Sequence, residues 1–188
     1  MGTRGSQSGS AERAFAALFE RTSQRVYGYV RRHCDDIDCD DIVSEVFLVA
    51  WRRLDDLPPD PIPWLLATAR RVLANHWRSR ERRYRLEAEL RGVAHLATHP
   101  DPAGLTADRA AMLAALSSLA APDREVLLLA GWDGLDAAGA AEVLDCSPVA
   151  ARARLSRARR RLELALAHAD TEPDDKVSAG IVQTRGGN

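Results

Sequence analysis

The chain has few of the features that mark membrane proteins, enzymes or cofactor-binding proteins. No apolar run in its 188 residues approaches the ~20 residues of a membrane-spanning helix, so we expect no membrane insertion. It has no Gly-rich phosphate loop, no nucleophile elbow and no paired His/Asp/Cys constellation. The carboxylate pairs Asp35–Asp36 and Asp55–Asp56 lie beside loops without a partner base. We therefore expect neither catalysis nor a cofactor.

Cysteine is also scarce. Cys34, Cys39 and Cys146 make an odd set, and we expect no signal peptide, so the sequence favours the reducing cytoplasm. His33 and Cys34 with Cys39 hint at a metal site. No second cysteine or histidine pair is spaced to complete it, so we expect no metal.

Lysine is nearly absent, since Lys176 is the only one among 26 basic residues. A GC-rich genome explains the choice of arginine over lysine, but not where the arginines lie. They are dense in two predicted helical segments, 64–83 and 147–162, although the formal net charge is only -1. Arginine forks match phosphates and guanine edges. Arginine concentrated on helices is typical of binding to a polyanion such as DNA.

Acidic residues form a zone of their own over residues 35–41. Zones of opposite charge indicate two partners, one anionic and one cationic. Asp40, Asp41 and Glu45 would repel phosphate, so this segment suits a basic protein partner. The alternative is that both zones are merely solvated helix faces.

Apolar spacing and proline positions predict an all-α chain of two small modules. Helices are expected over about 11–33, from a cap at Asp38 or Asp40 to Leu54, and again from Trp64. Prolines make the intervening residues 55–63 a loop. We expect 1–10 to be disordered, 11–90 to form the first module, 91–105 a flexible linker, 106–168 the second module and 169–188 a disordered tail.

The second module contains a helix-turn-helix pattern. Asp133-Gly134 is a predicted turn, and Asp136 can cap a short helix that ends near Leu144. Ser147-Pro148 supplies an N-cap and a first-turn proline for an arginine-rich helix. A short helix, a tight turn and a basic helix are typical of major-groove recognition.

The last predicted helix has a buried stripe and a basic face. The stripe consists of Ala151, Leu155, Ala158 and Leu162, which recur at helical spacing. We expect Arg152 and Arg157 to contact bases or flanking phosphates. Phosphate contacts bring affinity and salt dependence without sequence choice. The predicted DNA-binding residues here are Arg152, Ala153, Arg154, Ser156, Arg157, Arg159 and Arg160, of which Arg154, Arg159 and Arg160 mainly contact phosphates.

Three stretches resemble the sigma-70 family of RNA polymerase factors, in particular its extracytoplasmic-function group. Residues 40–51 resemble the polymerase-binding helix of region 2. Residues 63–78 resemble the helix that reads the minus-ten element. Residues 119–129, with 134–135 and 156–162, resemble region 4. Together, in this order, they cover about residues 14–166.

The resemblance implies partners and roles. Core RNA polymerase would be bound through its β′ clamp helices and β flap, promoter DNA would be the second partner, and an anti-sigma factor is a further candidate. The helix over 40–51 would bind polymerase through Asp40, Asp41, Ser44, Glu45 and Leu48. The opened strand of the minus-ten element would be bound by Arg70, Arg71, Asn75, Trp77, Arg78 and Arg82. The loop over residues 56–63 lies where the family has its base-capturing loop.

Aromatic residues in these segments have two interpretations. Trp64 and Trp77 are candidates to stack on bases or to anchor the module core; we favour the core for Trp64 and leave Trp77 open. Val43, Phe47 and Trp51 are expected in the core.

The chain departs from the family at four places. Ser44 stands where glutamine is usual, and Arg71 where asparagine is common. Residues 138–141 read Ala-Gly-Ala-Ala instead of Glu-Glu-Ile-Ala, and residues 149–150 read Val-Ala instead of Gly-Thr. Gly139 costs its helix roughly 1 kcal/mol relative to alanine.

Two other functions remain open. One is a dimeric helix-turn-helix regulator that needs no polymerase, which the acidic helix and the Arg/Trp helix argue against. The other is an interaction protein that has lost promoter reading, which the weakened stretch 138–141 favours.

Overall fold

The computed structural model describes residues 4–34, 36–90 and 107–169. These residues form seven α-helices and a short 3-10 helix, with no strand among them, which confirms the all-α expectation. The predicted linker lies outside the described residues, and so does the tail beyond Ala169. The elements are α1 (Arg4–Arg31), α2 (Asp36–Arg52), η1 (Leu54–Asp56), α3 (Ile62–Leu90), α4 (Ala107–Ser118), α5 (Ala121–Gly131), α6 (Ala137–Leu144) and α7 (Pro148–Ala169).

The first module consists of α1, α2 and α3, each of which packs against the other two. Their apolar residues recur at helical spacing and so form stripes that meet in one core. Val26 and Val30 of α1, Val46 of α2, and Leu65 and Leu66 of α3 have no exposed surface. At 25–30 cal/mol per Å² of buried apolar area, such stripes are the main stabilising term for the module.

The start of α1 corrects the prediction of a disordered segment over residues 1–10. The helix begins at Arg4, well before Ala11. Adding turns to a formed helix costs much less than nucleating one, which lets a Gly/Ser-rich segment continue it. Within this extension the Nε of Arg13 donates a hydrogen bond to the carbonyl oxygen of Gly9 at 2.9 Å. Residues 1–3 are outside the described part of the chain.

The start of α2 and the position of Trp51 also differ from expectation. The helix begins at Asp36, so Asp38 and Asp40 lie inside it and neither is its cap. The carboxylate of Asp38 instead contacts Nε2 of His76 on α3, at 3.2 Å. Phe47 is buried as expected, whereas Trp51 is 40% exposed. Trp51 lies at the edge of the module, where its ring packs against Phe15 with centroids 5.1 Å apart.

The second module packs α4, α5 and α6 around α7. Its core includes Val126 and Leu129 of α5 and Ala158 of α7, none of which is exposed. The predicted turn after α5 is present: Gly134 has a φ of 65°, a conformation that glycine adopts without the penalty of a side chain. The turn joins the end of α5 to the start of α6.

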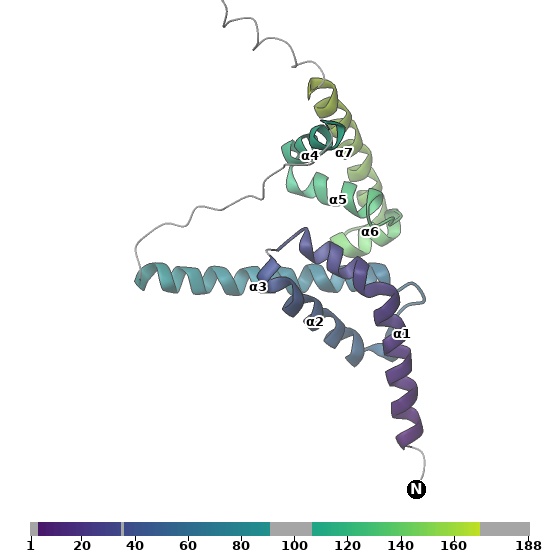
Figure 1. Cartoon of the computed structure of the whole chain (residues 1–188). Coiled ribbons are helices and arrows are strands. Elements are labelled where there is room, and N and C mark those ends of the chain that lie inside the picture. Colours follow the sequence, from purple (N-terminus) through teal and green to yellow (C-terminus); the bar gives the residue numbers. More distant parts are fainter. Residues whose placement is uncertain (1–3, 35, 91–106, 170–188) are drawn as a thin grey trace, which may run out of the picture.

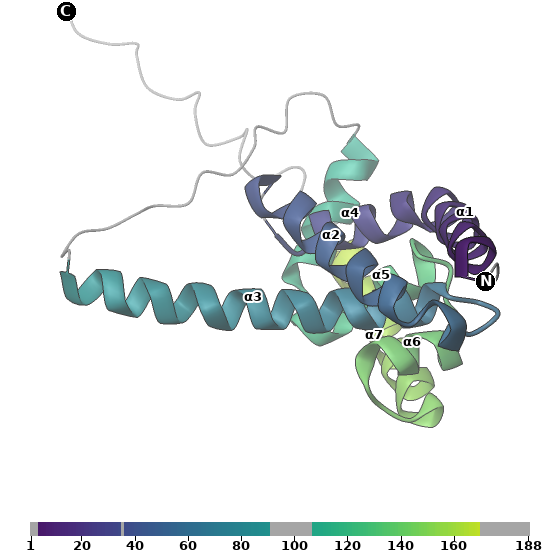
Figure 2. The same ribbon diagram turned by 90° about the horizontal axis from the view of Figure 1, so that it is seen from below.

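The two modules lie against each other (Figure 1). Helix α3 packs on α6, and the apolar residues of both modules form one continuous core cluster. The C-terminal half of α3 extends away from the other helices, which is clear in both Figure 1 and the perpendicular view of Figure 2. In the described part of the chain no helix is long and apolar enough to span a membrane.

Candidate nucleic-acid interface

Helices α6 and α7 form a helix-turn-helix whose ends are capped by local side chains. The carboxylate of Asp136 accepts a hydrogen bond from the backbone N–H of Gly139 at 2.8 Å, as the sequence predicts. Asp145 ends α6 in the left-handed conformation, with a φ of 53°. The hydroxyl of Ser147 then accepts from the N–H of Ala150 at 3.2 Å and caps α7. These caps set the angle at which α7 leaves the turn.

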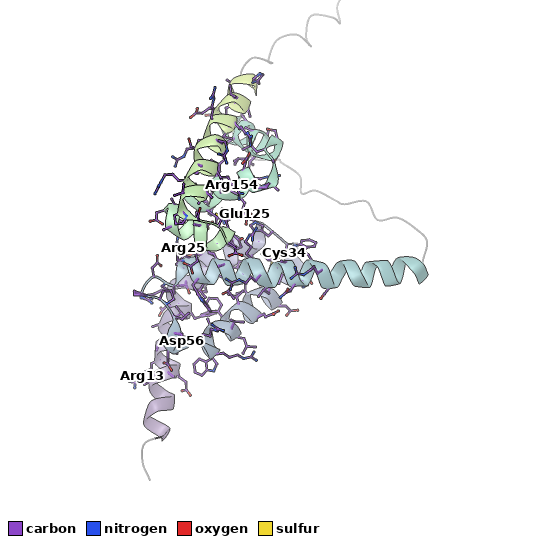
Figure 3. All side chains as sticks on the ribbon, turned by 180° about the vertical axis from the view of Figure 1, so that it is seen from behind. Arg13, Arg25, Cys34, Asp56, Glu125 and Arg154 are labelled. Carbon is purple, nitrogen blue, oxygen red and sulfur yellow. The ribbon has the colours of Figure 1, made fainter. Side chains whose placement is uncertain are left out.

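The basic face of α7 is open to solvent. Ala151 and Ala158 are buried and Leu155 is half-buried, so the predicted apolar stripe faces the module. The opposite side carries the predicted DNA-binding residues, and Figure 3 shows α7, with Arg154 labelled, along one edge of the molecule. Arg154 is half-buried, while the exposed members are Arg152, Ala153, Ser156, Arg157, Arg159 and Arg160.

One arginine of α7 has a structural partner. Arg161 pairs with the carboxylate of Asp123, a buried side chain at the start of α5. This ion pair connects α7 to α5. Because Asp123 neutralises the charge of Arg161, that charge does not add to the positive charge of the basic face. Arg161 therefore differs from Arg159 and Arg160, which have no acidic partner among the residues that the structure describes.

The predicted minus-ten residues lie on α3, but they do not form one surface. Arg71, Asn75 and Arg78 are exposed and share a face, and Nη2 of Arg78 donates to Oδ1 of Asn75 at 2.5 Å. Trp77 is 44% exposed, so it is not a core anchor, whereas Trp64 is half-buried and packs against the core. The side chain of Arg82 lies outside the described residues.

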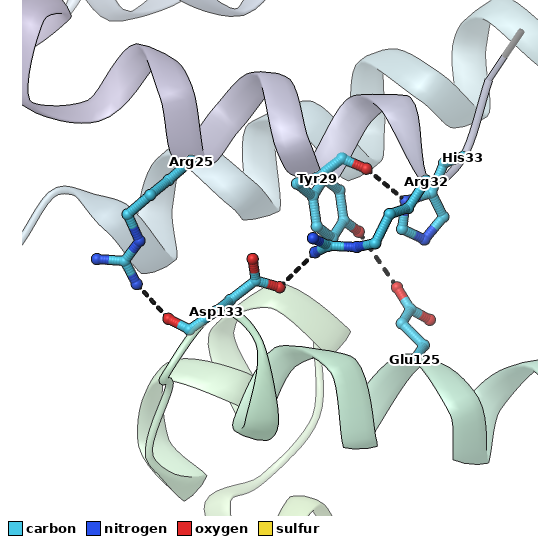
Figure 4. Close-up of polar contacts among 6 residues, drawn as sticks. All are labelled: Arg25, Tyr29, Arg32, His33, Glu125 and Asp133. Atoms are coloured by element: carbon cyan, nitrogen blue, oxygen red, sulfur yellow. Dashed lines mark hydrogen bonds and ion pairs between the residues drawn. The ribbon is translucent and has the colours of Figure 1, made fainter. Parts of the chain in front are cut away.

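Arg70 is partly exposed, and its guanidinium group contacts the second module. Its Nε donates to Oε1 of Glu125 on α5 at 2.9 Å. Burial alone would lower the pKa of Arg70, but the hydrogen bond and charge of Glu125 raise it above its ordinary value. The same carboxylate lies 3.3 Å from the hydroxyl of Tyr29 (Figure 4). Burial, together with the charge of Glu125, raises the pKa of that phenol, so Tyr29 stays neutral and donates.

The predicted polymerase-binding residues share one exposed face of α2. The core residues Ile42, Val43 and Val46 lie on the other side of the helix and are buried. Next to this face the rings of Phe15, Phe19, Phe47 and Trp51 form a cluster, in which the ring centroids of Phe19 and Phe47 are 4.7 Å apart. The members of the face are Asp40, Asp41, Ser44, Glu45 and the 49%-exposed Leu48.

Sequence reasoning missed two groups of residues. The first is the exposed aromatic edge beside α2, where Phe19 is 45% and Trp51 40% exposed; their helical spacing indicated only a core position. The second is the set of polar residues that join the modules, above all Glu125 and Asp133. No local pattern marks them, because their partners are about a hundred residues away. No cluster that could hold a metal ion occurs among the described residues.

Two family models match the chain, each over one of the modules. "Sigma-70 region 2" matches residues 18–83, and "Sigma-70, region 4" matches residues 109–162. RNA polymerase sigma factor CnrH of Cupriavidus metallidurans is 33% identical over 86% of this chain and 97% of its own length. ECF RNA polymerase sigma factor SigC of Mycobacterium tuberculosis is 34% identical over 87% of this chain and 86% of its own length.

Solved structures of the same family share the fold. CnrH in complex with the cytosolic domain of CnrY has a TM-score of 0.56 at 28% identity, over 86% of this chain and 91% of that one. The sigma factor RpoE of Bartonella quintana, in complex with the anti-sigma factor NepR, has a TM-score of 0.61 at 23% identity, over 81% and 96% of the two chains. The helix-turn-helix, the α2 and α3 surfaces and these matches lead to one conclusion: the chain belongs to the extracytoplasmic-function group of sigma-70 RNA polymerase factors.

Proposed function

We propose that this chain binds core RNA polymerase and directs it to promoters with a minus-thirty-five and a minus-ten element. The observation that carries the proposal is the separation of surfaces: the exposed acids of α2 lie on one module and the exposed arginines of α7 on the other. Helix α7 enters the major groove at the minus-thirty-five element, and α3 binds the opened minus-ten strand. The chain itself changes no covalent bond and acts in the cytoplasm.

The polymerase surface is the acidic face of α2 together with the aromatic edge beside it. Exposed Asp40, Asp41 and Glu45 attract a basic helix pair such as the β′ clamp helices. Leu48 and Trp51, which are 49% and 40% exposed, supply apolar area that becomes desolvated on binding. The β flap would bind the second module.

An anti-sigma factor is a further partner that we propose. Support comes from CnrH, which has been solved with the cytosolic domain of CnrY and resembles this chain over both modules. Such a partner would compete for the surfaces that bind polymerase, because one surface cannot hold two proteins at once.

Run-off transcription with purified core polymerase on genomic fragments tests the function. The wild-type chain should yield specific transcripts, and Arg152→Ala/Arg157→Ala should abolish them while leaving binding to core polymerase unchanged. Arg13→Ala is the matched control, because Arg13 is an exposed arginine on α1 outside the proposed DNA surfaces. Helix content by circular dichroism shows whether the double variant is folded.

The two alternative functions give different results in the same assay. A polymerase-independent regulator would bind duplex promoter DNA with or without core enzyme and yield no transcript. An interaction protein would bind core enzyme tightly and yield no transcript from any fragment. Fork-junction DNA, offered with and without core polymerase, distinguishes all three functions.

A further inference from the structure

The outward face of α7 is apolar at its first two turns. Val149 is 71% exposed, and Ala153, one turn further along, is exposed as well. The two residues are four positions apart, so their side chains lie on the same face of the helix. Ala151 and Ala158, which are 1% and 0% exposed, mark the opposite face. We call Val149 and Ala153 the apolar strip. Val149 stands where the family usually has glycine, so the strip is a feature of this chain.

Arginines border the apolar strip on both sides. An α-helix turns by about 100° per residue, which puts Arg152 on one side of the strip and Arg157 on the other. Both side chains are exposed. The major groove of DNA, about 12 Å wide, admits an α-helix, with phosphates along its rims and base edges on its floor. A helix face with an apolar centre and cationic borders fits this groove, because the arginines meet the phosphates while the strip meets the bases.

The first turn of α7 has few N–H groups to offer to phosphate. Helix N-termini commonly bind anions through such groups. Here Pro148 has no N–H, and the N–H of Ala150 donates to the hydroxyl of Ser147 at 3.2 Å. The N–H of Ala151 donates to the carbonyl oxygen of the same serine at 2.9 Å. What α7 presents at its tip is therefore chiefly the isopropyl group of Val149.

An apolar strip distinguishes bases by what it cannot bind. In the major groove only thymine carries a methyl group, and every base also presents hydrogen-bonding groups. Alkyl side chains form no hydrogen bonds, so covering a polar base edge with them leaves that edge unsatisfied. Contact with a methyl group instead removes apolar area from water. The apolar strip thus favours thymine over the other three bases.

We propose that the apolar strip selects thymine in the minus-thirty-five element, with Val149 as the main contact to the 5-methyl group and Arg152 and Arg157 on the neighbouring phosphates. The proposal rests on the function proposed above, and it adds a residue that determines which promoters are chosen. It also divides the work of the helix. The arginines supply affinity that falls with salt, and the apolar strip supplies sequence choice.

Deoxyuridine tests the contact, because it lacks only the methyl group of thymine. The full chain, bound to core polymerase, is titrated with a promoter fragment identified by run-off transcription, in which each thymine of the minus-thirty-five element is replaced in turn. At one position the replacement should weaken wild-type binding about three- to fivefold, through the loss of one buried methyl group. Val149→Ala should bind the unmodified fragment more weakly by a similar factor and should not respond to deoxyuridine at that position.

Leu164→Ala is the matched control. Leu164 is a 53%-exposed apolar residue of the same helix, about 22 Å along the axis from Val149. This variant should respond to deoxyuridine as the wild type does. Alanine is a strong helix former, so Val149→Ala should keep its helix content, which circular dichroism verifies. A wild-type chain that is indifferent to every deoxyuridine, or a Val149→Ala variant that responds as the wild type does, overturns the proposal.

A randomised duplex library tests the contact without a known promoter. The full chain selects from two libraries, one synthesised with thymidine triphosphate and the other with deoxyuridine triphosphate. The wild-type chain should enrich thymine at one position of the first library and no base at that position of the second, and Val149→Ala should lose the preference. Equal enrichment in both libraries, or none in either, overturns the proposal. Thymine enrichment without any transcript from core polymerase would instead refute the proposed function and leave the thymine contact standing.

Discussion

Arg70 and Glu125 join the two modules through an ion pair between Nε and Oε1, 2.9 Å apart. Arg70 lies on the helix that is predicted to bind the minus-ten strand, and Glu125 lies on α5 of the other module. Glu125 thus neutralises the positive charge of Arg70, which would otherwise attract the phosphates of DNA. The pair therefore adds a specific polar contact to the apolar packing of the two modules.

The first prediction concerns this pair. A double-mutant cycle with Arg70→Met and Glu125→Gln should give a coupling free energy of about 0.5–1 kcal/mol in urea unfolding. The value is small because the Arg70 side chain is 43% exposed and water screens its charge. Arg71→Met is the control, since Arg71 is exposed on the same helix and should combine additively with Glu125→Gln. Equal coupling for Arg70 and Arg71 would mean that the 2.9 Å contact has no specific effect.

The second prediction concerns the cap of α6. Asp136→Ala removes the acceptor for the N–H of Gly139 and should lower the free energy of unfolding by about 1 kcal/mol. The reason is that α6 is short and contains a glycine, so it depends on its cap. Thermal or urea unfolding measures the loss. Glu142→Ala, an exposed acid on the same helix, should change stability much less; a similar loss in both variants would rule out a specific cap.

The third prediction separates the arginines of α7. Arg159→Ala and Arg160→Ala should each reduce the slope of log affinity against log salt concentration by about 1, because each releases one phosphate contact. Arg161→Ala should leave the slope unchanged and lower stability instead, since its partner is Asp123. Fluorescence titration of a minus-thirty-five duplex at several salt concentrations gives the slopes. If Arg161→Ala alters the slope as much as the others, all three contact phosphate.

The fourth prediction concerns the acidic face of α2. Leu48→Glu should weaken binding to a β′ fragment that contains the clamp helices by roughly tenfold or more, because a charge replaces apolar area at the contact. Helix content should stay the same, since Leu48 is 49% exposed. Leu164→Glu, at a 53%-exposed leucine of α7, is the matched control. Equal binding by both variants would place the clamp contact elsewhere on the chain.

Local sequence signals predicted most of the helices. Pro122 and Pro148 lie in the first turn of α5 and α7, and Asp136 and Ser147 cap α6 and α7. Caps and prolines act over a few residues, so they can be recognised without knowing the fold. The start of α1 at Arg4 was not predictable in this way, because propagation from the rest of the helix outweighs poor local propensity.

The sequence by itself determined which face of a single helix is buried and which is exposed. The spacing of Ala151 and Ala158 sets which side of α7 is buried, and this leaves Arg152 and Arg157 on the open side. On α2, Asp40 and Glu45 were assigned by their charge and by the family resemblance, and the structure leaves both exposed while Ile42 and Val46 are buried. Helical periodicity is a local property, so such faces follow from the order of residues alone.

Only the tertiary structure decided which surfaces meet. Nothing near Arg70 or Arg32 in the sequence indicates that Glu125 and Asp133 will bind them, since these partners come from the other module. Gly139 looked like a weak point of its helix until the structure placed it against Pro63. The physical reason is that contacts between modules depend on shape and charge across a large separation in the chain, which no local pattern records.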